Sequence, residues 1–130
     1  MSLVSVIMPM RNGERFLAAA IASILDQDHP VEIIVVDDAS SDRSAAIAAA
    51  HGPAVRLVSL AVAGGAAAAR NRGLAVATGA FIAFLDCDDL WPPGKLRRQL
   101  ARLDAAPPVD AVSGTIALIE IGRASCRERV

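Results

Sequence analysis

The sequence predicts an α/β fold with a mostly parallel sheet flanked by helices, and three observations lead to that prediction. Short apolar runs alternate with longer stretches of helical periodicity, as in repeated βα units. The apolar runs are short, and the second is rich in β-branched residues. Polar residues collect directly after these runs, where the strands of a parallel sheet present their carboxyl ends to ligands. Four such units and a final strand predict a right-handed parallel arrangement.

Five runs are predicted to be strands. The first is a compact apolar run that ends at Pro9, and the second ends in Asp37 and Asp38. The fourth is wholly apolar and leads into an acidic cluster. The five strands are predicted at residues 3–8, 31–36, 55–60, 80–85 and 109–119.

Four stretches between these runs are predicted to be helices. The first carries Leu17, Ile21 and Ile24 at helical spacing. The second is rich in alanine, with Ser40 or Ser41 expected to cap it. Glycines bound the third, and a Pro-Pro-Gly segment starts the amphipathic fourth. The helices are predicted at residues 14–27, 40–51, 64–77 and from 92 onward.

Composition restricts the class of protein. A chain of 130 residues is one domain by length, and a formal net charge of −1 gives no reason to expect a nucleic-acid partner. Cys87 and Cys126 form no CxxC pair, which fits a reduced, intracellular setting. The first apolar run is too short for a membrane span or a signal peptide. We therefore expect a cytoplasmic location, with membrane association through a further C-terminal part left open.

Residues 120–130, EIGRASCRERV, break the preceding alternation and match no secondary-structure period. They resemble the in-frame translation of a common short-read sequencing adapter. We interpret them as a non-native tail, with a natural polar tail as the alternative. The domain is accordingly predicted to occupy residues 1–119, and the natural protein is expected to continue past Ile119.

The acidic cluster Asp86-Cys87-Asp88-Asp89 is the most informative motif. Three carboxylates within four residues repel one another unless they are solvated or neutralised. Mg²⁺ or Mn²⁺ takes oxygen ligands and commonly bridges to substrate phosphates. One aspartate can then reach a ribose hydroxyl while another binds the metal. An acidic turn that caps the following segment is the alternative.

Two further segments are candidate ligand contacts. Asp38, and less so Asp37, is predicted to accept an N–H from a nucleotide base, whereas Asp42 is interpreted as a helix cap. Arg70 lies in a helix of small residues and can reach a base or a pyrophosphate. The segment has neither a Gly-x-Gly-x-x-Gly nor a P-loop motif. Trp91 is expected to pack the loop after the cluster, with stacking on a sugar as the alternative.

Three blocks together resemble the family 2 glycosyltransferases of the GT-A fold. They are VSVIMPMRNGERFLAAAIASIL, VEIIVVDDASSD and AAARNRGLAVATGAFIAFLDCDDLWPPGKL, and the resemblance covers roughly residues 3 to 104. It implies a Rossmann-like GT-A domain, truncated at its C-terminus, that binds a nucleoside-diphosphate sugar, often UDP-linked, with a divalent metal. It also implies transfer to an acceptor hydroxyl by direct displacement, with inversion of the anomeric centre. The acceptor itself is not indicated.

The resemblance assigns roles to individual residues. The base would contact Asp38, with Asp37 beside it, and the ribose would contact Asp86. The metal would be held by Asp88, with Asp89 close by. Arg70 would lie near the base or the diphosphate, and a loop would cover the nucleotide. That loop comprises Pro9, Met10, Arg11 and Asn12.

This chain departs from the family pattern at two positions. Arg11 stands where the family often has an aromatic residue that stacks on the base, and Ala63 where it often has asparagine. The family's general base is a carboxylate that lies beyond residue 119, so the 130-residue chain is expected not to turn over by itself. A nucleotidyltransferase and a non-catalytic nucleotide- or sugar-binding module are the alternatives.

Overall fold

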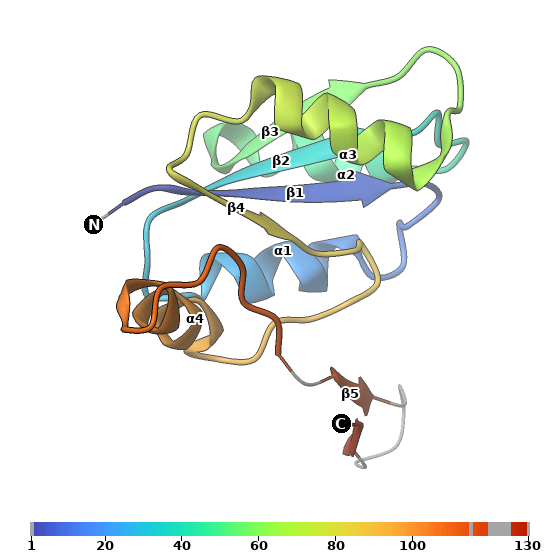
Figure 1. Ribbon diagram of the computed structural model, residues 1–130. Helices are drawn as coiled ribbons and strands as arrows, with labels where there is room; N and C mark the ends of the chain where they lie inside the picture. Colours follow the sequence, from blue (N-terminus) through green and yellow to red (C-terminus); the bar gives the residue numbers. More distant parts are fainter. Residues whose placement is uncertain (1, 115, 120–125, 130) are drawn as a thin grey trace. The chain divides into compact units, whose positions relative to one another are not determined.

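The computed structural model describes residues 2–114, 116–119 and 126–129. The chain divides into two units, Met1–Arg97 and Arg98–Val130, and each is considered by itself. The first unit holds a four-stranded parallel sheet in the order β3-β2-β1-β4 (Figure 1). Its strands are β1 (Val4–Met10), β2 (Val31–Asp37), β3 (Val55–Ser59) and β4 (Phe81–Phe84).

The strand order creates a crevice at one edge of this sheet. The chain runs outward from β1 through β2 to β3, and then returns to place β4 on the other side of β1. Such a reversal leaves a crevice at the carboxyl ends of the central strands. β1 is buried along its whole length, which explains its continuous apolar sequence. The predicted parallel α/β sheet is therefore confirmed for the first four strands.

Helices cover both faces of the sheet. In Figure 1, α1 (Leu17–Leu25) lies below the sheet and α3 (Gly65–Val76) above it. The short α2 (Ser44–Ala49) packs beside α1 and against β2 and β3, followed by a 3₁₀ turn at Gly52–Ala54. The last helix, α4 (Lys95–Asp104), begins in the first unit and ends in the second.

The small residues of α3 let the helix approach the sheet closely, as the sequence predicts. Ala69 is fully buried against Ile34 and Val36 of β2. A Cβ atom on Gly73 would lie 2.5 Å from Ile7 Cγ2 of β1, closer than real atoms approach. This close contact holds the start of α3 beside the carboxyl ends of β1 and β2.

A hydrogen-bond network at the amino ends of the strands determines where β4 begins. The Glu32 carboxylate accepts hydrogen bonds from the Ser5 hydroxyl, from the Thr78 N–H at 2.6 Å and from the Thr78 hydroxyl at 2.8 Å. The Gly79 N–H donates to Ser5 Oγ at 2.7 Å. Burial acts to raise the pKa of Glu32, but the hydrogen bonds from Ser5 and Thr78 outweigh it and lower that pKa.

Three predicted details of the secondary structure are wrong. Residues 109–114 form no strand, and β5 (Ile116–Ile119) pairs antiparallel with β6 (Cys126–Arg129) in the second unit, not with the parallel sheet. Neither Ser40 nor Ser41 caps α2, because both bond to Asn12 instead. Helix α1 begins three residues later than predicted, since residues 14–16 form a turn in which the Phe16 N–H donates to the Gly13 carbonyl.

The outer part of the sheet carries exposed apolar side chains. Within the described residues β4 pairs with β1 alone, and its Ile82 and Phe84 are 41% and 47% exposed.

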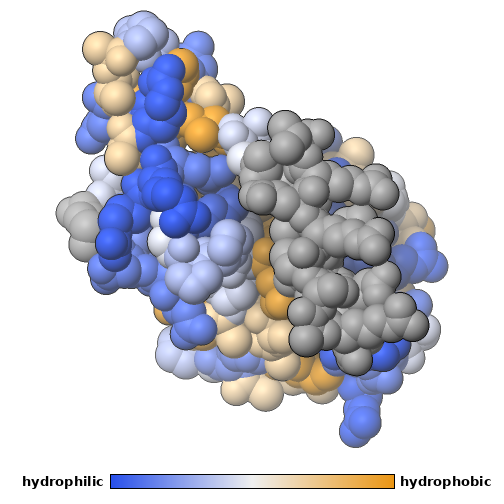
Figure 2. Space-filling model, turned by 90° about the horizontal axis from the view of Figure 1, so that it is seen from below, coloured by the Kyte–Doolittle hydropathy of each residue, from blue (hydrophilic) through white to orange (hydrophobic). Residues whose placement is uncertain are grey.

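The face shown in Figure 2 mixes hydrophilic and hydrophobic residues. In the described part of the chain, no helix combines the length and the apolar character that crossing a bilayer requires.

Candidate nucleotide-sugar and metal site

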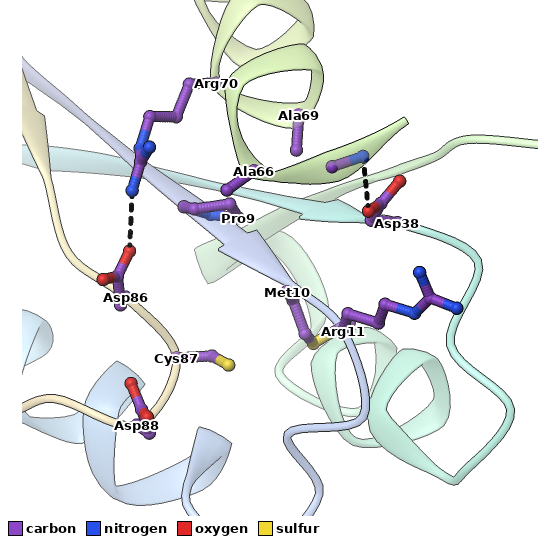
Figure 3. A pocket seen from close by; sticks show the side chains of 11 residues that line it. Pro9, Met10, Arg11, Asp38, Ala66, Ala69, Arg70, Asp86, Cys87 and Asp88 are labelled. Atoms are coloured by element: carbon purple, nitrogen blue, oxygen red, sulfur yellow. Dashed lines mark hydrogen bonds and ion pairs between the residues drawn. The ribbon is translucent and has the colours of Figure 1, made fainter. Parts of the chain in front are cut away.

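A pocket of about 340 Å³ opens at the carboxyl ends of β1, β2 and β4, beside the start of α3 (Figure 3). This is the place where the order of the strands reverses. Residues from four segments of the first unit line it. They are Pro9 and Met10 at the end of β1 with Arg11 just after it, Asp38 after β2, Gly65, Ala66, Ala69 and Arg70 of α3, and Asp86, Cys87 and Asp88 after β4.

Most of the predicted contact residues lie in this one pocket, although they come from distant parts of the sequence. Three predicted residues do not line it: Asn12 lies in the loop after β1, Asp37 is the last residue of β2, and Asp89 directly follows the lining residue Asp88. The predicted contacts that line it are Pro9, Met10, Arg11, Asp38, Arg70, Asp86 and Asp88.

Asp38 joins the end of β2 to the start of α3. The residue is 4% exposed, and its two carboxylate oxygens accept the N–H groups of Gly64 at 2.7 Å and Gly65 at 3.0 Å. Its own N–H donates to the Met10 carbonyl at 2.8 Å. Gly65 has a φ of 88°, which explains a glycine at that position. Each Asp38 oxygen keeps a lone pair for a ligand, so the side chain can both shape the pocket and bind in it.

Asp37 shapes the turn that follows β2. Its Oδ1 accepts the Ser40 N–H at 3.0 Å, and the side chain is buried. Ala39 has a φ of 57°, an unfavourable conformation for a residue other than glycine. The Asp37 hydrogen bond stabilises that conformation. Asp37 therefore has a structural contact of its own, one residue away from the pocket.

The loops after β1 and β2 are tied together by a reciprocal set of hydrogen bonds that the sequence reasoning missed. The Asn12 N–H donates to Ser40 Oγ at 2.9 Å, and Asn12 Oδ1 accepts the Ser41 N–H at 2.8 Å. The Glu14 N–H donates to Asp42 Oδ2 at 3.2 Å. Asp42 Oδ1 also accepts the Ser44 N–H at 2.9 Å, so the predicted cap residue bonds to the first residue of α2, although the N-cap position itself is Arg43. These bonds fix residues 12–14, which follow Arg11, against residues 40–42, which follow Asp38.

The acidic cluster after β4 has the composition and spacing of a cation site. Asp86, Asp88 and Asp89 are exposed, and their nearest carboxylate oxygens all lie within 4.8 Å of one another. Two oxygens bound to one Mg²⁺ or Mn²⁺ at about 2 Å lie at most about 4 Å apart, so small rotations of these exposed side chains would let all three share one ion. Partial desolvation, followed by the charges of Asp88 and Asp86, raises the pKa of Asp89 above its ordinary value. A divalent cation would relieve this repulsion, so the residues fit such an ion.

The two arginines of the pocket differ in their partners. Arg70 Nη2 lies 3.2 Å from Asp86 Oδ1, so that α3 and the segment after β4 meet across the pocket (Figure 3). Among the described residues, no carboxylate lies within ion-pair distance of the Arg11 guanidinium. The pocket therefore brings arginine and aspartate side chains together, as a diphosphate accompanied by a metal ion requires.

Cys87 packs beneath the loop that follows β1. A Cβ atom on Gly13 would lie 2.6 Å from Cys87 Sγ, so only glycine fits there without movement. Burial raises the pKa of the Cys87 thiol, with the neighbouring carboxylates acting in the same direction. The thiol is therefore a neutral packing group, in agreement with its interpretation as a small residue between two aspartates.

Trp91 packs into the protein, as its first interpretation predicts, and the alternative of sugar stacking is wrong. The residue is 7% exposed, and Lys95 Nζ lies 4.2 Å from the centre of its ring. The Trp91 N–H donates to Ser23 Oγ of α1 at 3.1 Å. A ring buried and covered in this way cannot present a face to a ligand.

Comparison with known proteins identifies the family. Residues 5–129 match the model of the family described as glycosyl transferase family 2. The chain belongs to glycosyl transferase family 2. This family 2 chain is 42% identical over 103 residues to the UDP-Glc:alpha-D-GlcNAc-diphosphoundecaprenol beta-1,3-glucosyltransferase WfgD of Escherichia coli. That match includes 78% of the chain but 41% of the length of the E. coli enzyme.

Solved structures with the same fold contain nucleotide sugars. A crystal structure of S. aureus TarS in complex with UDP-GlcNAc aligns with a TM-score of 0.72 and 29% identity, over 80% of this chain and 31% of that one. The mannosyltransferase PcManGT from Pyrobaculum calidifontis, in complex with GDP-Man and Mn²⁺, aligns with a TM-score of 0.74 and 31% identity. That alignment covers 81% of this chain and 33% of the mannosyltransferase. The predicted family and the GT-A architecture of this family 2 chain are thus confirmed.

Proposed function

We propose that the full-length protein transfers a sugar from a nucleoside-diphosphate sugar to an acceptor hydroxyl, with inversion and with a divalent cation. The observation that supports this most is one pocket in which Asp38, Arg70 and the cluster of Asp86, Asp88 and Asp89 meet at the reversal of the strand order. Structural neighbours that hold UDP-GlcNAc, or GDP-Man with Mn²⁺, support the same class of donor.

The contacts suggest a division of labour around the donor. Asp38, backed by Asp37, accepts an N–H of the base, and Arg11 lies on the same side of the pocket. Asp86 accepts a ribose hydroxyl, and Asp88 and Asp89 hold Mg²⁺ or Mn²⁺, which neutralises charge on the diphosphate. The segment of Pro9, Met10, Arg11 and Asn12, at the end of β1 and just after it, covers the nucleotide.

The proposed reaction is a direct displacement. The acceptor oxygen forms a bond to the anomeric carbon as the bond from that carbon to the diphosphate oxygen breaks. The nucleoside diphosphate leaves with the electron pair, and Arg70 can stabilise its negative charge. The acceptor proton passes to a carboxylate base that we place beyond residue 119. The 130-residue chain therefore binds the donor weakly or not at all, and does not turn over.

The donor and acceptor are proposed at the level of chemical class. UDP is the first choice of nucleotide, because the E. coli relative is named for UDP-Glc and TarS is seen with UDP-GlcNAc. The name of that relative specifies a diphosphoundecaprenol-linked sugar as its acceptor. We accordingly propose a growing cell-envelope polysaccharide as the acceptor class.

Calorimetric titration of UDP into the full-length protein, with and without Mn²⁺, tests the proposal. We expect binding that requires Mn²⁺ and that is lost in Asp88→Ala. Asp26→Asn removes an exposed carboxylate at the end of α1 and is the matched control, with unchanged binding expected. Metal-independent binding, or none to a folded protein, would contradict the metal assignment. Binding without transfer to any acceptor would favour a non-catalytic module.

A further inference from the structure

The loop that carries the acidic cluster is anchored at both ends. Before the cluster, Leu85 is buried and its N–H donates to the Ile7 carbonyl of β1 at 3.2 Å. After the cluster, Trp91 is buried and its N–H donates to Ser23 Oγ of α1 at 3.1 Å. The exposed aspartates lie on the short stretch between these anchors. Their spacing therefore depends on where each anchor holds the chain.

Gln27, just beyond the end of α1, supplies most of the second anchor. The residue is 6% exposed, although glutamine is usually a surface residue. Its Nε2 donates to the Pro92 carbonyl at 3.0 Å and to the Ser23 carbonyl at 3.2 Å. Its Oε1 accepts the Leu96 N–H at 3.1 Å. One buried amide thus holds both ends of the segment from residue 92 to residue 96.

Ser23 completes this anchor from the same helix. Its hydroxyl donates to the Ala20 carbonyl at 2.7 Å while it accepts the Trp91 N–H. Ser23 and Gln27 are four residues apart, so their side chains lie on the same side of the helix end. They together bind three backbone groups of residues 91–96, directly after the cluster.

We propose that Gln27, assisted by Ser23, is a positioning residue for the cation site, acting through residues 91–96 on Asp88 and Asp89. Removal of the Gln27 amide leaves the buried Leu96 N–H without its acceptor and leaves the Pro92 carbonyl only the longer bond from the Lys95 N–H, at 3.4 Å, so the segment must move to satisfy the Leu96 N–H. Gln27 contacts none of the three aspartates itself, but carboxylate ligands tolerate little displacement, and changes to residues that support metal ligands commonly cost about tenfold or more in metal affinity. The inference rests on the proposed cation site.

The test is an EPR titration of Mn²⁺ into the full-length protein at a fixed UDP concentration, with thermal unfolding measured alongside. Gln27→Met keeps the length of the side chain and removes its hydrogen bonds, and we expect the apparent Mn²⁺ Kd to rise about tenfold. Ile21→Val, on the core face of the same helix, is the control: it lowers Tm by removing a buried methyl group and leaves the Kd unchanged.

The outcomes distinguish an effect of Gln27 on the position of the cation ligands from an effect on the stability of the fold. An Mn²⁺ Kd in Gln27→Met equal to that of the wild type, or a rise matched by Ile21→Val, would overturn the proposal and leave the proposed function intact. Absence of Mn²⁺ binding in the wild type would overturn both. Should Gln27→Met fail to fold, Ser23→Ala removes one hydrogen bond of the same anchor. A several-fold rise in its Kd supports the proposal, and an unchanged Kd contradicts it.

Discussion

Arg70 on α3 donates a hydrogen bond to Asp86 after β4, with Nη2 and Oδ1 3.2 Å apart, and so joins the two sides of the pocket. The side chains remain 41% and 51% exposed. An ion pair in such contact with water contributes little to folding stability. The geometry therefore points to ligand binding as the main use of this arginine.

We predict that Arg70→Ala in the full-length protein leaves Tm nearly unchanged and weakens binding of UDP in the presence of Mn²⁺ by about 10- to 100-fold, since a hydrogen bond to a charged group is lost. Calorimetry and thermal unfolding measure the two effects. Arg72→Ala, which removes an exposed arginine of the same helix, is the control and should bind as the wild type does. A large fall in Tm with unchanged affinity for UDP would show that the pair is structural.

Asp38 is expected to affect both stability and binding, because its carboxylate accepts the N–H groups of Gly64 and Gly65. Asp38→Ala leaves both N–H groups without this acceptor and should lower the free energy of unfolding by about 1–3 kcal/mol. Asp38→Asn keeps one oxygen acceptor and should lose less. Urea unfolding of both variants checks the order. Equal stability of Asp38→Ala and the wild type would contradict the bridging role.

The contact between Gly13 and Cys87 predicts a non-additive pair of substitutions. Gly13→Ala places a methyl group against Cys87 Sγ and should destabilise the protein by about 1–3 kcal/mol through overpacking. Cys87→Ala removes that sulfur. The double variant should therefore recover part of the loss caused by Gly13→Ala alone. A double-mutant cycle by chemical unfolding measures the coupling, and strictly additive effects would rule out this contact.

The lowered pKa of Glu32 determines the direction in which the free energy of unfolding changes with pH. Because its pKa is lowered in the folded protein, its charge stabilises the fold above the unfolded-state pKa, and this contribution is lost as the pH falls through the folded-state value. We predict that Glu32→Gln lowers the free energy of unfolding by about 1 kcal/mol near pH 7. The difference from the wild type should shrink below about pH 4. Urea unfolding between pH 3 and 7 tests this, and a constant difference would contradict it.

The fold was predictable where apolar runs and their order carry the information. The sequences of β1 and β2 indicate buried strands, because both faces of these strands are covered and their residues are apolar. The segments after β1, β2 and β4 were expected to meet, because parallel strands have their carboxyl ends at the same edge of a sheet. The fifth strand was not predictable. The apolar alternation of residues 109–119 gives no indication of its partner, and only Ile116–Ile119 forms a strand, antiparallel to β6.

That Asp38, Arg70 and the acidic cluster would lie close together was predictable from the order of the elements, and the arrangement of the loops after β1 and β2 was not. Their arrangement depends on Asn12 and Ala39, which have φ values of 50° and 57°. Alanine gives no sign in a sequence that its backbone is left-handed. Ser40, Ser41 and Asp42, in the loop after β2, were predicted only to be helix caps. That Asn12 would bond to Ser40 and Ser41 follows from the closeness of two loops, which only the folded chain displays.

The outer edge of β4 has a practical consequence for work with this chain. In the described sheet its backbone has hydrogen-bonding groups with no neighbouring strand, and Ile82 and Phe84 place apolar surface beside them. An open edge of this kind is a template on which another copy can add a strand. Samples of the 130-residue chain will therefore tend to self-associate as the concentration rises, and low concentrations during purification and storage should keep the sheet from extending between molecules.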